Sequence, residues 1–183
     1  MPRVGIALGS NLGDRLSNLQ AARDCLREIA TPGESFLQAS IYQTEPLLCP
    51  PGSPLFLNTV IEIDFSSDPF ELLDLTRAIE KNLGRTDNAE RNAPRVIDVD
   101  LLYFGDEIID TAALALPHPR LSERRFVLQP CAEIRPGLIL PGHTRSIAAL
   151  LADLQSAEPP LVRLSHGWIP PIAHSPPVTT IQG

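Results

Sequence analysis

The chain has 183 residues, of which 43% are hydrophobic and 20% are charged, as is typical of a single soluble globular domain. A net charge of −7 disfavours nucleic-acid binding, because proteins that bind nucleic acids usually present a basic face. Three cysteines without paired spacing disfavour a disulfide framework or a zinc site. The opening residues resemble neither a signal peptide nor a membrane span. The unpaired cysteines suit a reducing cytoplasm, where we expect the protein.

Hydrophobic periodicity and turn residues predict elements in the order β-α-β-β-α-β. The expected strands and helices are, in chain order, a strand at 4–8, a helix at 14–30, strands at 35–43 and 55–65, a helix at 69–84, a strand at 95–104, a helix from about Ser122 and a short helix at 146–155. This order predicts an α+β fold, namely a ferredoxin-like (split βαβ) antiparallel sheet with helices packed on it.

The C-terminal segment of the chain differs in composition from the rest. Residues 1–155 are expected to form one domain, whereas residues 156–183 form a C-terminal tail with six prolines in 28 positions. Proline lacks a backbone N–H, so this tail cannot be a regular helix or a central strand. Two alternatives stay open: the tail wraps the surface in extended form, or it is partly mobile.

Two aspartates, Asp98 and Asp100, interrupt the strand expected at 95–104, although aspartate is depleted in strands. Residues two apart in a strand share one face at about 6.7 Å, so Val99 and Leu101 face the apolar layer instead. Two carboxylates this close repel each other unless a cation lies between them, and oxygen ligands suit Mg²⁺. The pair predicts a magnesium site that handles phosphates, unless it lies on a solvent-exposed edge where it has no role.

Arginines precede and follow this strand. They are Arg85, Arg91, Arg95, Arg120, Arg124 and Arg125. Arginine binds phosphate with two parallel hydrogen bonds, so the cluster favours a triphosphate ligand, although a single arginine is more often a solvated surface charge. His118 lies between two prolines in the segment that follows the strand. Residues 9–14 lack the spacing and the lysine of a phosphate-binding P-loop and predict a tight strand-to-helix turn.

Six segments occur in a specific order: GSNLGDR (9–15), IYQTEP (41–46), FLNTVIEI (56–63), IEKNLGR (79–85), APRVIDVDLLYFG (93–105) and LPHPRLSERRFVLQP (116–130). Together they resemble the 6-hydroxymethyl-7,8-dihydropterin pyrophosphokinase family of folate biosynthesis over roughly residues 4 to 141. The resemblance implies an ATP- and Mg-dependent diphosphokinase that transfers pyrophosphate from ATP to the pterin hydroxymethyl oxygen and releases AMP. Such a reaction requires mainly positioning and charge neutralisation.

The resemblance also implies residue roles. The catalytic set is Arg85, Arg95, Asp98 and Asp100, of which Asp98 and Asp100 would bridge two Mg²⁺ ions. The pterin set is Thr44, Glu45, Leu47, Phe56, Asn58 and Phe126, with Asn58 at the ring edge and the two phenylalanines stacked on the ring. The ATP set is Arg77, Glu80, Arg85, Arg95, Leu101, His118 and Arg124. The expected partners are ATP and the pterin, with no nucleic acid and no membrane, and the expected state is a monomer.

The chain departs from the family pattern in the 85–95 loop, which closes over ATP in the family. Many relatives have a second arginine where this chain has Asp87, and a tryptophan where it has Asn92; Arg91 is placed to compensate. Three alternatives stay open: another Mg-dependent phosphotransferase or nucleotidyltransferase, a ferredoxin-like binding module without catalysis, and a family member that binds pterin without turnover.

Overall fold

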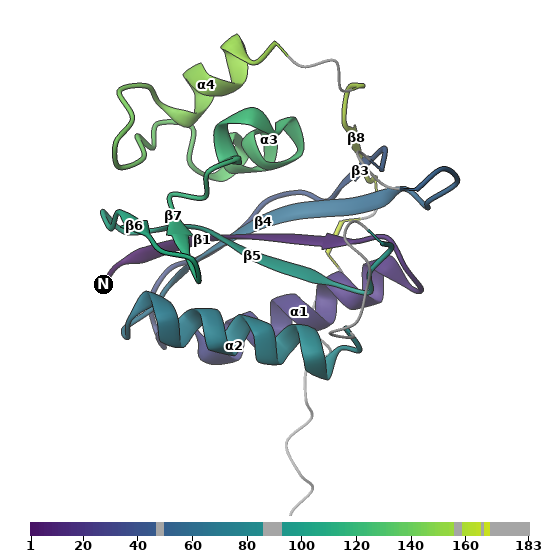
Figure 1. The fold of residues 1–183 in the computed structure, drawn as a ribbon, viewed down its shortest axis with the longest axis horizontal. Coiled ribbons are helices and arrows are strands. Elements are labelled where there is room, and N and C mark those ends of the chain that lie inside the picture. Colours follow the sequence, from purple (N-terminus) through teal and green to yellow (C-terminus); the bar gives the residue numbers. More distant parts are fainter. Residues whose placement is uncertain (47–49, 86–92, 156–158, 166, 169–183) are drawn as a thin grey trace, which may run out of the picture.

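A computed structural model of the chain describes residues 1–46, 50–85, 93–155, 159–165 and 167–168. Its main sheet is antiparallel, with the strand order β5-β1-β4-β3-β8 and with β2 also paired to β4 (Figure 1). The strands are β1 (Arg3–Ser10), β2 (Phe36–Gln38), β3 (Tyr42–Thr44), β4 (Phe56–Asp64), β5 (Asp98–Phe104) and β8 (Val162–Arg163). A second sheet pairs β6 (Ile109–Asp110) with β7 (Ala115–Leu116).

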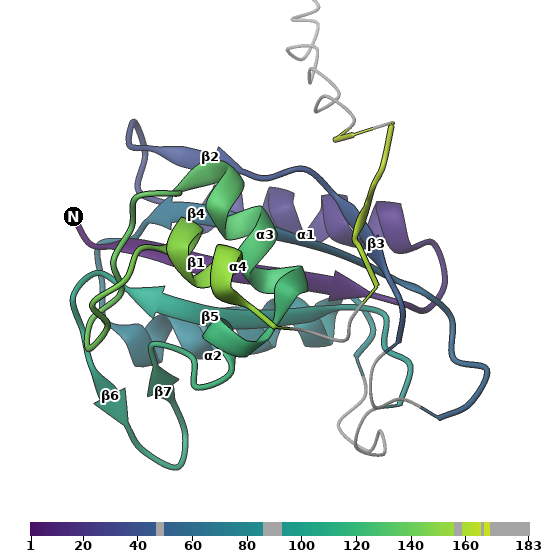
Figure 2. The same cartoon turned by 90° about the horizontal axis from the view of Figure 1, so that it is seen from above.

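Helices cover both faces of the main sheet (Figures 1 and 2). The helices α1 (Arg15–Ile29) and α2 (Pro69–Asn82) cover one face, and α3 (Arg125–Ile134) and α4 (Ile147–Asp153) cover the other. Each face has its own apolar core between sheet and helices. The prediction of an α+β protein with helices on an antiparallel sheet is therefore confirmed. None of the helices in the described part of the chain is long and apolar enough to span a membrane.

Side-chain caps begin the helices where the sequence predicts. The Asp14 carboxylate accepts a hydrogen bond from the Ser17 N–H (3.1 Å), and the Asp68 carboxylate accepts from the N–H groups that open α2. Ser146 caps α4 in the same way. Such caps satisfy N–H groups that have no partner within the helix.

Two predicted elements differ from the structure. A single strand at 35–43 is wrong: the segment forms β2 and β3, because the Ser40 N–H donates to Glu133 of α3 (3.0 Å) and the backbone leaves the ladder there. The helix expected near Ser122 is also interrupted. A 3-10 turn, Leu121–Glu123, is followed by an extended Arg124, and α3 begins only at Arg125.

Candidate active site

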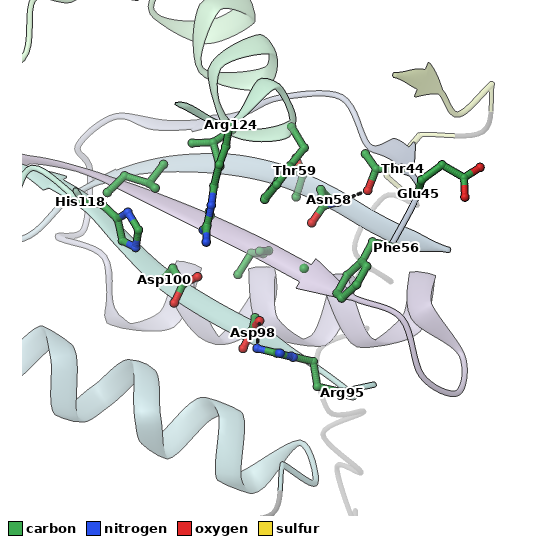
Figure 3. Close-up of a pocket in the computed structure, with 16 residues that line it drawn as sticks. Thr44, Glu45, Phe56, Asn58, Thr59, Arg95, Asp98, Asp100, His118 and Arg124 are labelled. Carbon is green, nitrogen blue, oxygen red and sulfur yellow. Dashed lines mark hydrogen bonds and ion pairs between the residues drawn. The ribbon is translucent and has the colours of Figure 1, made fainter. Parts of the chain in front are cut away.

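A cavity of about 160 Å³ lies on the α3 face of the sheet, beside the N-terminal end of α3 (Figure 3). Its lining combines strands β1, β3, β4 and β5 and helix α3 with the loops next to β3, β5 and α3. Ten residues to which the sequence resemblance assigns roles line it together: Thr44, Glu45, Phe56, Asn58, Arg95, Asp98, Asp100, His118, Arg124 and Phe126. Residues far apart in the sequence thus meet in one cavity.

The strand β5 presents its two aspartates to this cavity. Asp98 and Asp100 line it, whereas Val99 and Leu101 belong to the core under α1 and α2, so the predicted alternation of faces is confirmed. Leu101 is only 4% exposed. A ligand in the cavity could therefore reach Leu101 only through its backbone.

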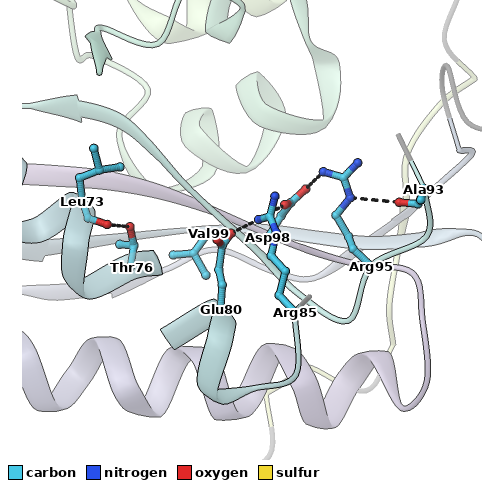
Figure 4. Close-up of polar contacts among 8 residues, drawn as sticks. All are labelled: Leu73, Thr76, Glu80, Arg85, Ala93, Arg95, Asp98 and Val99. Atoms are coloured by element: carbon cyan, nitrogen blue, oxygen red, sulfur yellow. Dashed lines mark hydrogen bonds and ion pairs between the residues drawn. The ribbon is translucent and has the colours of Figure 1, made fainter. Parts of the chain in front are cut away.

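Asp98 is held between two arginines (Figure 4). Its Oδ1 accepts from Arg85 Nη1 and its Oδ2 accepts from Arg95 Nη1, both at 2.7 Å. Arg85 also pairs with Glu80, whose carboxylate accepts the backbone N–H of Val99 (2.8 Å). Glu80 thus binds the outer edge of β5 and orients Arg85 towards Asp98.

Burial dominates the electrostatics of these carboxylates. Burial and the negative charge of Asp100 raise the pKa of Asp98, against the opposing effect of Arg95 and Arg85. Burial likewise raises the pKa of Glu80. Asp100 is exposed, and no residue in the described part of the chain forms a hydrogen bond or an ion pair with its carboxylate. One carboxylate is therefore partnered and its neighbour is open.

The donor set fits Mg²⁺. The described residues contain no group of three or more histidine, cysteine or acidic side chains that could hold a metal by themselves. Mg²⁺ is usually held by one or two carboxylates together with substrate phosphates and water, so a pair of aspartates beside arginines suits it when phosphate is present.

Asn11 was not among the predicted site residues, yet it fixes the backbone of Arg95. Its Oδ1 accepts the Arg95 N–H (2.8 Å), its own N–H donates to the Arg95 carbonyl (3.2 Å), and its Nδ2 donates to the Pro54 carbonyl (3.3 Å). Asn11 is fully buried. The sequence signal was present, since asparagine after a strand often bonds the backbone of a loop, but its partners are distant in sequence.

The opposite half of the cavity carries the residues assigned to the pterin. Asn58 Nδ2 donates to Thr44 Oγ1 (2.7 Å), while Phe56 from β4 and Phe126 from α3 line the same cavity. Gly9, also missed, lies beneath Asn58, because a Cβ at this position would be 2.9 Å from Asn58 Oδ1. A side chain at position 9 would displace the Asn58 carboxamide.

His118 and Arg124 complete the cavity opposite Asp100 (Figure 3). The His118 Nδ1 accepts the Arg120 N–H (3.1 Å), which leaves Nε2 to carry the proton in the neutral ring. Burial, together with Arg124 and Arg120, lowers the pKa of His118. A neutral His118 therefore has one N–H donor available at neutral pH.

Several assigned residues lie elsewhere. Arg77 is an exposed residue of α2 that pairs with Asp74 (3.8 Å) and does not line the cavity. Glu80 and Arg85 do not line the cavity either; Arg85 contacts Asp98, and Glu80 contacts Arg85. Leu47 and the loop positions Asp87, Arg91 and Asn92 are outside the described residues.

Comparisons with known proteins agree on one family. The model of the 7,8-dihydro-6-hydroxymethylpterin-pyrophosphokinase (HPPK) family matches residues 5–136. The 2-amino-4-hydroxy-6-hydroxymethyldihydropteridine pyrophosphokinase of Bacillus subtilis is 47% identical over 129 residues, which cover 70% of this chain and 75% of the relative. The enzyme of that name from Pseudomonas aeruginosa is 38% identical over 151 residues, covering 82% and 90%.

Solved structures agree at the level of the fold. Wild-type HPPK-DHPS of Plasmodium falciparum, solved with pteroate, superposes with a TM-score of 0.65 at 15% identity. The match covers 82% of this chain and 42% of that one, so the chain spans less than half of the length of that protein. This likeness shows the fold alone.

Together these matches define a pyrophosphokinase, a transferase that moves a pyrophosphate group. More narrowly, the chain belongs to the HPPK family. Its reaction is pyrophosphate transfer to hydroxymethyldihydropterin in folate biosynthesis, and the prediction of this activity from the sequence is confirmed.

Proposed function

We propose that the chain transfers pyrophosphate from ATP to the hydroxymethyl oxygen of 6-hydroxymethyl-7,8-dihydropterin, releases AMP and depends on two Mg²⁺ ions held by Asp98 and Asp100. The observation that carries this proposal is the arrangement of one cavity, in which paired carboxylates and arginines lie beside two aromatic rings and an amide. The first group suits a metal-bound triphosphate and the second a flat heterocycle.

Arginines bind and orient the ATP phosphates in this proposal. Arg95 and Arg124 line the cavity, and Arg85 lies behind Asp98. Asp98 binds Arg85 and Arg95 in the structure; if Asp98 held a cation instead, Arg95 would be free to bind phosphate oxygens, and Arg85, whose Nη1 stays paired with Glu80, would offer them its Nη2. His118 adds a neutral N–H donor.

Asp98 and Asp100 would hold Mg²⁺ together with the phosphates, and the metal would supply charge neutralisation and polarisation of the attacked β-phosphorus. The side chains do the positioning. Asp100 keeps a carboxylate exposed to the cavity, and Asn11 holds the Arg95 backbone so that its guanidinium can be directed at the phosphates. Positioning and electrostatic stabilisation are the main requirements of phosphoryl-type transfer.

The pterin is proposed to lie between Phe56 and Phe126, with its polar edge on Asn58 and on backbone groups of Thr44 and Glu45. The Thr44 hydroxyl accepts a hydrogen bond from Asn58 Nδ2, and this bond fixes the orientation of the Asn58 carboxamide oxygen. An orientation set in advance lowers the entropy cost of binding.

We further propose a ferredoxin-like fold and a cytoplasmic monomer. The first is supported by the order β5-β1-β4-β3 with α1 and α2 on one face. The reducing compartment is supported by the free thiols of Cys25 and Cys131. Light scattering of the purified protein tests the monomer.

The decisive experiment measures AMP formation from Mg-ATP, with and without 6-hydroxymethyl-7,8-dihydropterin, for the wild type and for Asp98→Ala. We expect AMP only when the pterin, Mg²⁺ and Asp98 are all present. AMP release without pterin would favour another phosphotransferase. A folded wild type that binds the pterin and forms no AMP would favour a pterin-binding protein without turnover.

A further inference from the structure

Part of the proline-rich tail is bound to the edge of the main sheet. We call residues 159–165 and 167–168 the strap. Within it, β8 pairs antiparallel with β3 through Tyr42↔Arg163 and Gln43↔Val162, and the Leu164 N–H donates to the Ile41 carbonyl (2.9 Å). The match to the family model ends at residue 136, so the strap lies beyond it.

The strap contacts both faces of the sheet. On the α3 face, Arg163 lies 3.9 Å from the Glu133 carboxylate, which also binds Ser40 and Tyr42. On the α1 face, Leu164 and Trp168 pack against the apolar core.

Trp168 anchors the far end of the strap. Its indole N–H donates to the Ala39 carbonyl (2.8 Å), and the Arg23 guanidinium lies 5.0 Å from its ring centroid. The strap is therefore held at two points: at β3, through β8, and at Ala39, which precedes β3 in the chain, through Trp168.

The strand that receives the strap leads directly into the cavity. β3 has only three residues. On the side away from β8 it pairs with β4, through Tyr42↔Asn58 and Thr44↔Phe56, and so contacts the residues assigned to the pterin. Glu45, which lines the cavity, follows immediately. A three-residue strand with one partner is weakly held, and a second partner restricts its fraying.

We propose that the strap positions the pterin half of the active site: by pairing with β3 and anchoring at Trp168, it holds Thr44 and Glu45 against Asn58. No described residue of the strap lines the cavity, so the strap acts on the pterin half indirectly, through β3. This inference rests on the proposed function, because it concerns the affinity of the proposed pterin pocket. Coupling of this kind is reciprocal, so pterin binding must stabilise the docked strap by the same factor.

The test compares two substitutions at one position in the full chain. Leu164→Pro removes the N–H that pairs with Ile41, and Leu164→Ala keeps it while losing the side chain. Titration calorimetry then measures the dissociation constants of the pterin and of Mg-ATP. We expect Leu164→Pro to weaken pterin binding about tenfold relative to Leu164→Ala, within the usual range of such coupling, and to change Mg-ATP binding less than twofold.

A purely structural strap would lower the melting temperature of Leu164→Pro without this difference between the two ligands, and that result would overturn the proposal. A wild type that binds no pterin would overturn the proposed function instead.

Hydrogen exchange of the wild-type Leu164 amide provides a test without any variant. Saturating pterin must slow it about tenfold, and an unchanged rate would contradict the coupling.

Discussion

Two charged clusters lie at opposite ends of α3. At the C-terminal end, Arg135 binds Glu62 Oε1 through Nε and Nη2 (2.7 and 2.6 Å), and the Tyr103 hydroxyl donates to Glu62 Oε2 (2.7 Å). At the N-terminal end, Asp100 and Arg124 line the cavity, and no described residue satisfies either side chain by a hydrogen bond or an ion pair.

The difference between the clusters lies in what is left for a ligand. Both oxygens of Glu62 are bound, and its side chain is 2% exposed, so this closed cluster can only connect α3 to the sheet. The open cluster leaves a carboxylate and a guanidinium facing a cavity. A buried charge is tolerated only when it is paired, whereas an unpaired charge at a cavity is available to substrate or metal.

The largest expected effect is on catalysis, in Asp100→Asn. We expect the rate of pterin-dependent AMP formation to fall about 1,000-fold, the scale of losing a group that acts on charge in the transition state. The melting temperature should not fall, because Asp100 is exposed and its repulsion of Asp98 disappears. Rates and thermal unfolding of the same preparation check this, and a large loss of stability would contradict an open cluster.

Glu62→Gln should show the reverse pattern. It leaves Arg135 without its carboxylate, and we expect the free energy of unfolding to fall by about 3 kcal/mol, the low end for a buried pair because Arg135 is partly exposed. The rate per folded molecule should stay within about threefold. Urea unfolding measures the loss. Exposed Glu107→Gln is the matched control and should change stability by less than about 0.5 kcal/mol.

Arg124→Ala tests the cation of the open cluster. Loss of a hydrogen bond to a charged phosphate is worth about 1.5–3 kcal/mol, so we expect KM for ATP to rise about 10- to 150-fold. The KM for pterin should change much less. Arg145→Ala, which removes an exposed arginine paired with Asp153 on α4, is the control and should leave both constants unchanged.

The smallest effect concerns pH and Glu133, which joins α3 to β3. Burial alone would raise the pKa of Glu133, but hydrogen bonds from Ser40 and Tyr42 outweigh it and leave the pKa below its usual value. A lowered pKa contributes stability above the unfolded-state value of about 4.3, and that stability is lost as the pH falls through the folded value.

We therefore expect the melting temperature of the wild type to fall more steeply than that of Glu133→Gln below about pH 4.3. The contribution is less than about 1 kcal/mol, because the Glu133 side chain is partly exposed. Parallel curves for the two proteins at pH 3 to 7 would show that Glu133 does not link α3 to β3.

Local patterns were sufficient for the elements whose causes are local. The caps Asp14 and Asp68 follow from side chains that bond their own helix, and the two faces of β5 follow from the period of a strand. The family resemblance spans all the segments that carry the ten assigned residues, and the structure brings these ten residues together in one cavity. Their individual roles stay predictions.

Only the tertiary structure decided which distant groups meet. Nothing near Ser40 in the sequence indicates that Glu133 interrupts the strand there, and nothing near Asn11 indicates that it holds Arg95. The proline content of the tail excluded a regular helix or a central strand, but it predicted neither the pairing of the tail with β3 nor the partial burial of Trp168. The physical reason is that caps and strand faces depend on neighbouring residues, whereas these contacts depend on packing between segments far apart in the chain.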